Sequence, residues 1–172
     1  MQHKKIAASL FSALKSGKAL TPITETHPGI SIDDAYKISL AFLDLRVVKN
    51  NEKIVGKKIG VTSKAVQDML GVFQPDFGFL TDGMAVLDGR VNVDCLISPR
   101  AEAEIAFKLH TDLKGPGITG KDVLAATKYI QPCFEIVDSR ILDWKIKIQD
   151  TVADNASCGV FILGDKKVNP ND

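Results

Sequence analysis

The sequence has no dense block of basic residues and no run of about 20 apolar residues, the length that a membrane-spanning helix needs. Its 172 residues carry 22 Lys and Arg against 21 Asp and Glu, a formal net charge of +1. A balance this close to zero lacks the electrostatic footprint of proteins that bind nucleic acid or anionic membranes. The first twenty residues also lack a separate apolar block of the signal-peptide kind. We therefore expect a soluble, cytoplasmic protein without nucleic-acid or membrane partners.

Cysteine and histidine are scarce, with three residues of each. Cys95, Cys133 and Cys158 lie far apart and form no CxxC motif. This spacing argues against a disulfide framework or a zinc site, and it fits a reducing compartment. The histidines show no paired spacing, and no Ser/His/Asp or Cys/His arrangement stands out. The 45% of hydrophobic residues suffice for a sizeable core, which excludes disorder as the main state.

The first fifty residues predict two helices, of which the first is amphipathic. Apolar side chains at helical spacing favour a helix over residues 5–16, with Gly17 as its C-terminal cap. Ser31, with an acidic residue three positions later, predicts the start of a second helix over residues 31–48. The segment between them, residues 21–30, contains two prolines and a glycine and is predicted to be a loop.

After about residue 50 the pattern changes to short apolar runs separated by Gly, Pro and Asp, which is typical of strands. We expect strands at residues 54–61, 79–87, 102–109, 134–137 and 158–163. Short helices are expected between them, at residues 63–70 and 121–130. The polar tail, residues 164–172, has no closing element and therefore predicts a chain that stops within its fold.

Two carboxylates alternate with alanine in the sequence RAEAEIAF, residues 100–107. In a strand, Glu102 and Glu104 would lie on one face, because successive side chains point to opposite faces. Like charges this close repel each other unless a cation or basic side chains compensate them, and carboxylate oxygens favour Mg²⁺ or Mn²⁺. A solvated strand face compensated by nearby Lys or Arg is an equally compatible interpretation.

A third carboxylate, Glu135, lies within the apolar run CFEIV, where an unpaired charge would be costly. Three carboxylates leave open positions on an octahedral ion, which suits a bidentate 2-oxo acid substrate. The alternative is an edge-strand glutamate that points to water.

Three further segments offer polar groups for chemistry. Lys57 and Lys58 lie in GKKIG; a lysine that faces an apolar pocket is a candidate acid or base, because burial lowers its pKa, although an exposed strand lysine is more common. Asp76 lies in QPDFG, where a turn aspartate usually binds its own backbone. The segment DNAS, residues 154–157, precedes an apolar run and suits hydrogen bonding to a substrate.

Several segments together resemble one family. They read IVGKKIGVTS at residues 54–63, QPDFG at 74–78, RAEAEIA at 100–106, DW at 143–144 and DTVADNAS at 150–157. This pattern resembles the 2-hydroxypenta-2,4-dienoate hydratases, in the hydratase/decarboxylase branch of the fumarylacetoacetate hydrolase superfamily. The resemblance runs from about residue 30 to the end, and several long segments in the right order are more specific than any one motif.

The resemblance implies an α+β fold. An N-terminal helical region would span residues 1–50. Residues 51–172 would form the first part of a catalytic domain, a mixed β-barrel or roll of the fumarylacetoacetate hydrolase type that is truncated at the C-terminus.

The resemblance also implies a divalent-metal-dependent hydro-lyase. The metal, Mg²⁺ or Mn²⁺, would be bound by Glu102, Glu104 and Glu135. Lys58 and Asp76 would be catalytic, and Ser157 would contact the substrate. Lys58 matches the family's strand lysine better than its neighbour Lys57 does.

The activity implied is the addition of water to 2-hydroxypenta-2,4-dienoate to give 4-hydroxy-2-oxopentanoate, in meta-cleavage degradation of aromatic compounds. Asp76 favours a hydratase, because decarboxylases of this branch tend to carry an apolar residue there. Two alternatives stay open: a metal-dependent 4-oxalocrotonate (2-oxo-3-hexenedioate) decarboxylase, and a non-catalytic partner subunit. The resemblance further implies a homo-oligomer and association with a related decarboxylase or aldolase.

Overall fold

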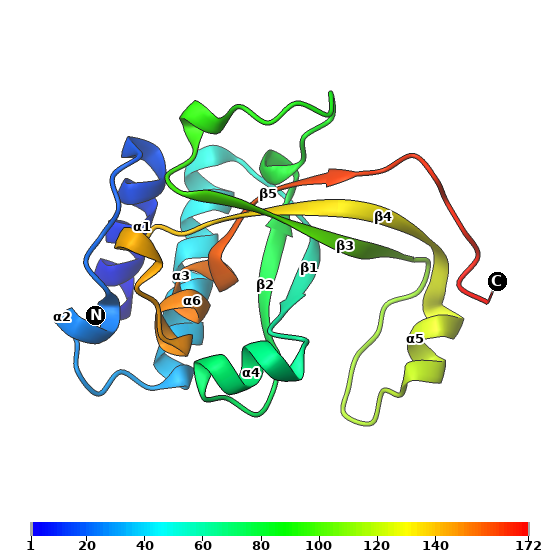
Figure 1. Cartoon of the computed structure of the whole chain (residues 1–172), viewed down its shortest axis with the longest axis horizontal. Helices are drawn as coiled ribbons and strands as arrows, with labels where there is room; N and C mark the ends of the chain where they lie inside the picture. The colour runs from blue at the N-terminus through cyan, green and yellow to red at the C-terminus, as the bar shows by residue number, and fades with distance from the viewer. Residues whose placement is uncertain (1, 172) are drawn as a thin grey trace.

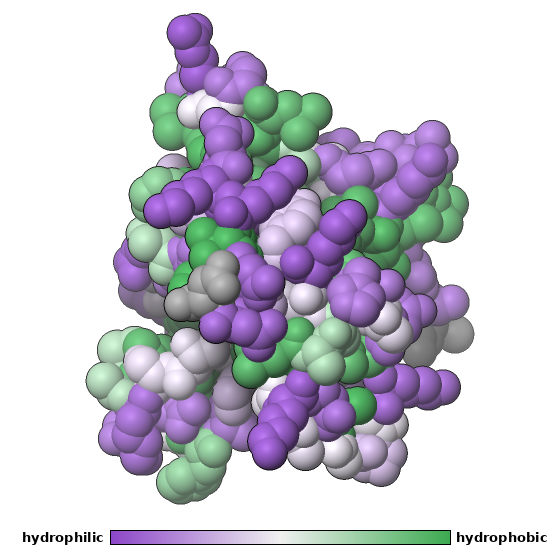
Figure 2. Space-filling model, turned by 90° about the vertical axis from the view of Figure 1, so that its right-hand side faces the viewer, coloured by the Kyte–Doolittle hydropathy of each residue, from purple (hydrophilic) through white to green (hydrophobic). Residues whose placement is uncertain are grey.

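The computed structural model describes residues 2–171, and it places a group of helices at one end and two antiparallel sheets beside them (Figure 1). A long sheet extends away from the helices and carries a short helix at its far end. Seen from that far end, hydrophobic side chains are interrupted by hydrophilic ones (Figure 2). No helix within residues 2–171 is long and apolar enough to cross a membrane.

Helices α1 (Gln2–Ser16) and α3 (Ile32–Asn50) confirm the two predicted helices. The Ser31 side chain accepts a hydrogen bond from the Asp34 amide, and the Asp34 side chain accepts one from the Ser31 amide. A cap of this kind stabilises a helix by about 1 kcal/mol. The predicted loop before α3 contains a short helix, α2 (Ile23–Thr26), which sequence reasoning missed.

A third element from much later in the chain completes the helical core. Helix α6 (Ile148–Ala153) packs against α3, and its Asp150 is fully buried. Asp150 accepts hydrogen bonds from the amide and the hydroxyl of Thr24, which ties α6 to α2. The core residues around these helices are mainly aliphatic: Ile6, Ala7, Leu10, Ile23, Ala35, Ile38, Phe42, Ile141, Val152 and Ala153.

The first sheet is a pair of antiparallel strands, β1 (Ile54–Gly60) and β2 (Asp76–Thr81). Helix α4 (Lys64–Leu70) connects them, with Ser63 as its N-cap and Gly71 as its C-cap. The prediction of a turn at residues 74–78 was wrong for its second half, because Asp76, Phe77 and Gly78 pair with β1. The expected strand at 79–87 therefore begins three residues earlier and ends at Thr81.

The second sheet has the order β3–β4–β5 and only antiparallel pairs. Its strands are β3 (Pro99–Leu109), β4 (Thr127–Asp138) and β5 (Cys158–Leu163). Helix α5 (Gly120–Ala126) is shorter than expected, because the β-branched and aromatic residues from 127 onward pair with the end of β3 instead. The expected bounds of β5 are confirmed.

The sheets do not close into a barrel in the described part of the chain, so the closed form of the expected β-barrel is corrected to two separate antiparallel sheets. The long sheet has two unlike faces. The odd-numbered positions 101–107 of β3 are apolar, as are their partners at even positions of β4. Ile105, Phe107 and Phe134 on this face are about half exposed, at 60%, 49% and 52%. The opposite face carries the carboxylates described below.

A fully buried ion pair links the end of β4 to α6 and β5. Arg140 Nε lies 2.6 Å from Asp154 Oδ1, and both side chains are inaccessible to solvent. Arg140 also donates hydrogen bonds to the carbonyl oxygens of Asp154 and Cys158, at 2.7 and 3.0 Å. All three elements are therefore fixed to one guanidinium group.

We expect Arg140→Met to lower the free energy of unfolding by about 3–5 kcal/mol, because it leaves Asp154 buried without its partner. Urea denaturation measures the change. Lys64→Met, which breaks the exposed pair with Asp68, is the matched control and should leave the midpoint nearly unchanged. A similar small loss in both variants would contradict the role given to Arg140.

Candidate active site

The three predicted metal ligands lie on the same face of the long sheet. Glu102 is paired with Glu135 across β3 and β4, and Glu104 is paired with Cys133. Glu135 is 7% exposed, whereas Glu102 and Glu104 are exposed. Within residues 2–171, no three acidic, histidine or cysteine side chains come close enough to hold an ion as they stand. The register thus brings the donors to one face without closing a cage around an ion.

Lys58 is the partner of the buried Glu135. Its Nζ lies 3.2 Å from Glu135 Oε1 and donates a hydrogen bond to the carbonyl oxygen of Ala156 at 3.1 Å. Oε1 itself has no well-directed hydrogen bond. Because β1 and β4 belong to different sheets, this ion pair holds the two sheets against each other. The edge-strand alternative for Glu135 is wrong, since this carboxylate points to a lysine and not to water.

The pKa of Lys58 is raised, whereas burial alone would lower the pKa of a lysine. Burial acts to lower the pKa of Lys58, but the negative charges of Glu135 and Asp76 outweigh it, so the pKa lies above its ordinary value. Burial raises the pKa of Glu135, and the Lys58 ammonium opposes that shift. Lys58 is therefore a cation and a hydrogen-bond donor at neutral pH.

Asp76 lies at the start of β2, opposite Gly60 of β1, and is 5% exposed. Its Oδ1 has no hydrogen-bond partner among the described residues. A Cβ at residue 60 would overlap this oxygen and would also lie close to Lys58 Nζ, so the missing side chain of Gly60 makes room for both groups. Burial raises the pKa of Asp76, although the Lys58 charge opposes the shift. A carboxyl group with these properties can hold a proton at a higher pH than usual.

Ser157 lies in a strained turn between α6 and β5. Asn155, Ala156 and Ser157 have φ values of 57°, 51° and 52°. These values lie in the left-handed region, which residues other than glycine disfavour. The Ser157 hydroxyl is buried and lies 3.1 Å from the Thr151 hydroxyl. The carbonyl oxygen of Ala156, the residue before Ser157, accepts a hydrogen bond from Lys58 Nζ. The turn therefore places Ser157 next to the residue that binds Lys58.

The other polar groups of the DNAS segment serve the fold. The Asn155 side chain accepts a hydrogen bond from the Phe79 amide and donates one to the Phe79 carbonyl, at 2.8 and 2.9 Å. Gly78 permits this close approach, because a Cβ there would lie 2.5 Å from the Asn155 carbonyl oxygen. Asp154 is committed to Arg140. These two side chains are therefore occupied by the protein itself.

Sequence reasoning missed Cys158 as a neighbour of the site. The thiol is fully buried, and burial and the nearby Glu135 charge raise its pKa to about 12. It is therefore a neutral neighbour of Glu135. No local signal could have placed it there, because the contact depends on the pairing of β4 with β5.

Curated proteins named as hydratases resemble this chain over nearly its whole length. A 2-hydroxyhexa-2,4-dienoate hydratase of Comamonas testosteroni is 61% identical over 164 residues, which cover 94% of this chain and 62% of that protein. A 2-hydroxypent-2,4-dienoate hydratase of Pseudomonas putida is 58% identical over 96% of this chain and 75% of its own length. The chain belongs to the 2-hydroxypent-2,4-dienoate hydratase family. A scan against models of protein families gives no match.

Solved structures similar to this hydratase-family chain include two of the 4-oxalocrotonate decarboxylase from Pseudomonas putida G7. One, in complex with magnesium and adipate, has a TM-score of 0.93 and 35% identity, and the match covers 99% of this chain and 65% of that one. The other, with calcium and acetate, has a TM-score of 0.91 and 34% identity. This chain therefore spans about two thirds of the length of these proteins.

We expect Lys58→Met to raise the pKa of Glu135 further, because the buried carboxylate loses the charge that opposes its desolvation. The same variant should lower the free energy of unfolding at neutral pH by about 1–3 kcal/mol. A ¹³C NMR titration of the glutamate carboxyl groups and urea denaturation measure the two effects. Lys57→Met, which removes the exposed neighbouring lysine, is the control. If the pKa of Glu135 is unchanged in Lys58→Met, Lys58 is not the partner of this carboxylate.

Proposed function

We propose that this chain provides the residues for the hydration of 2-hydroxypenta-2,4-dienoate to 4-hydroxy-2-oxopentanoate. The observation that carries the proposal is the gathering of Lys58, Asp76 and Glu135, from three strands of two sheets, next to the carboxylate face of β3. Membership of the hydratase family supports the choice of reaction. We also propose Ser157 as a substrate contact, because its turn adjoins Lys58.

We propose that Glu102, Glu104 and Glu135 hold a divalent cation, Mg²⁺ or Mn²⁺. The donor set fits, because it consists of carboxylates on one face of adjacent strands, and the Lys58 ammonium is the partner of the buried Glu135 Oε1, which has no well-directed hydrogen bond. Glu102 and Glu104 are exposed, so their side chains are free to change rotamer. When bound, such an ion stabilises negative charge that develops on the oxygens of a 2-oxo acid.

Asp76 would transfer the protons, and Lys58 would assist as a fixed positive charge. Asp76, in its protonated form, would give its proton to C5 of the dienol while the enol hydroxyl releases its own proton to solvent water. As a carboxylate, Asp76 would then accept a proton from the water that adds to C4, and C3 would take a proton from solvent, which balances the one that the enol released. Lys58, as a permanent cation, would orient the developing oxyanion and keep Glu135 ionised.

The decarboxylase alternative is supported by the shared fold, but the sequence similarity is weaker, at 35% against 58–61% for the two hydratases. The decarboxylase reaction would need Lys58 and the same carboxylates but no water addition at C4. The homo-oligomer, the pathway partners, the non-catalytic alternative and the cytoplasmic location stay predictions.

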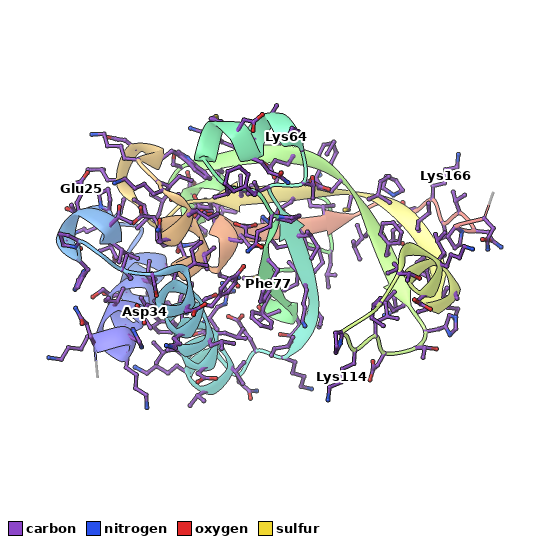
Figure 3. All side chains as sticks on the ribbon, turned by 90° about the horizontal axis from the view of Figure 1, so that it is seen from below. Glu25, Asp34, Lys64, Phe77, Lys114 and Lys166 are labelled. Carbon is purple, nitrogen blue, oxygen red and sulfur yellow. The ribbon has the colours of Figure 1, made fainter. Side chains whose placement is uncertain are left out.

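Incubation with 2-hydroxypenta-2,4-dienoate and Mn²⁺ should yield 4-hydroxy-2-oxopentanoate, and a chelator should stop the reaction. Loss of dienol absorbance and NMR of the product follow it. Glu104→Ala should lose turnover and weaken Mn²⁺ binding measured by calorimetry, whereas Glu25→Ala on α2, far from the sheet face (Figure 3), should do neither. Formation of only the ketonised acid would reject the hydratase proposal, and release of CO₂ from 2-oxo-3-hexenedioate would favour the decarboxylase.

Asp76→Asn should lower kcat by about 10²–10⁴-fold, because it removes the group that transfers protons. KM should change much less, since the variant keeps the size of the side chain. Steady-state kinetics measures both values, with Asp68→Asn on the exposed face of α4 as the matched control. An unchanged kcat would remove Asp76 from the mechanism.

A further inference from the structure

A small apolar cavity lies beside Asp76, on the side of the helices. Its volume is about 250 Å³, and its walls come from α3, α6 and the segment between α4 and β2. Its lining includes Ile32, Tyr36, Asp76, Ile148 and Val152, together with the segment 71–75. Asp76 thus belongs both to the polar cluster with Lys58 and to the wall of this cavity.

The side of the cavity formed by α3 and α6 is packed against its surroundings. The Tyr36 ring stacks on Phe77 with a centroid distance of 4.6 Å, and Figure 3 shows Phe77 between β2 and α3. Val152 is 1% exposed and belongs to the helical core, against which Ile148 packs. Val72 and Ile32 line the cavity and are only half-buried, so they lie on its solvent side.

The size and chemistry of the cavity limit what it can receive. Sites that hold a whole small ligand usually measure about 300–1,000 Å³, so this one suits part of a molecule. None of the described residues that line it is basic, and Asp76 is acidic. An anionic group in the cavity would lose its hydration without gaining a partner, which is costly. A short hydrocarbon chain would replace water there at no such cost.

We propose that this cavity receives the hydrocarbon end of the substrate beyond C4, and that Ile32 and Val72 set the longest tail accepted. This inference rests on the proposed function, because it places C4 and C5 at Asp76. Within the substrate class already proposed, the cavity then admits hydrogen or a short unbranched alkyl group on C5. A dicarboxylate, with its second charge at the tail, does not fit the cavity.

Two variants change the cavity in opposite directions. Val72→Phe fills it, and Ile32→Ala enlarges it. The measured quantity is the ratio of kcat/KM for 5-propyl-2-hydroxypenta-2,4-dienoate to that for the unsubstituted acid. Val72→Phe should lower this ratio at least about tenfold, and Ile32→Ala should raise it, because one or more methylene groups change their fit to an apolar wall. Val48→Phe, at a position that is 79% exposed on α3, is the matched control and should leave the ratio unchanged.

A binding measurement separates the failure of this inference from the failure of the proposed function. The probes are the unreactive acids 2-oxopentanoate and 2-oxooctanoate, titrated calorimetrically in the presence of Mn²⁺. Val72→Phe should weaken binding of the longer acid at least about tenfold more than that of the shorter one. Circular dichroism checks that each variant is folded.

The outcomes are distinct. Hydration with an unchanged tail-length ratio and unchanged relative binding in both variants overturns the cavity assignment and leaves the hydratase proposal standing. Absence of hydration, together with tail-dependent binding that Val72→Phe abolishes, overturns the reaction and supports the cavity. Efficient turnover of a dicarboxylate that Val72→Phe blocks would overturn the choice of a neutral tail.

Discussion

The buried ion pair of Arg140 and Asp154 is the constraint on which the site depends. Arg140 fixes the carbonyl oxygens of Asp154 and Cys158, which are the two ends of the turn between α6 and β5. That turn presents the Ala156 carbonyl to Lys58, and Lys58 in turn holds Glu135. A charge pair deep in the protein therefore determines where the polar groups of the candidate active site lie. Such pairs contribute little net stability, but removing one partner is expensive.

The turn itself shows why so many bonds are needed. Three consecutive residues with left-handed backbone each cost about 1–2 kcal/mol relative to a relaxed conformation. The bonds of Asn155 to Phe79 and those of Arg140 to the turn offset that cost. Lys58 thus has a fixed acceptor before any ligand arrives, and such preorganised polar groups are what a reaction that develops charge requires.

The sequence predicted the features that depend on neighbouring residues. Ser31 marks the start of α3 because a cap needs only a residue three positions away. The alternation of Glu102 and Glu104 is likewise local. The raised pKa of Lys58 was not predictable, because it depends on carboxylates from two other strands. Asp76 was misplaced in a turn because its Pro and Gly neighbours indicate one, whereas pairing with β1 decides its conformation. The ion pair of Arg140 was not predictable either, because its partners lie 14 and 18 residues later in the chain.

Because the two faces of the long sheet differ, the proposed chemistry depends on the register of its strands. Even-numbered positions 102 and 104 of β3 carry carboxylates, and the odd-numbered positions beside them are apolar. A slip of β3 by one residue would move every carboxylate to the apolar side and every apolar group to the reactive side. The Asp138 carboxylate fixes the register of β3, because it accepts hydrogen bonds from the amides of Ile97 and Ser98 just before the strand begins. Fidelity of strand alignment is thus as much a condition for the reaction as any catalytic side chain.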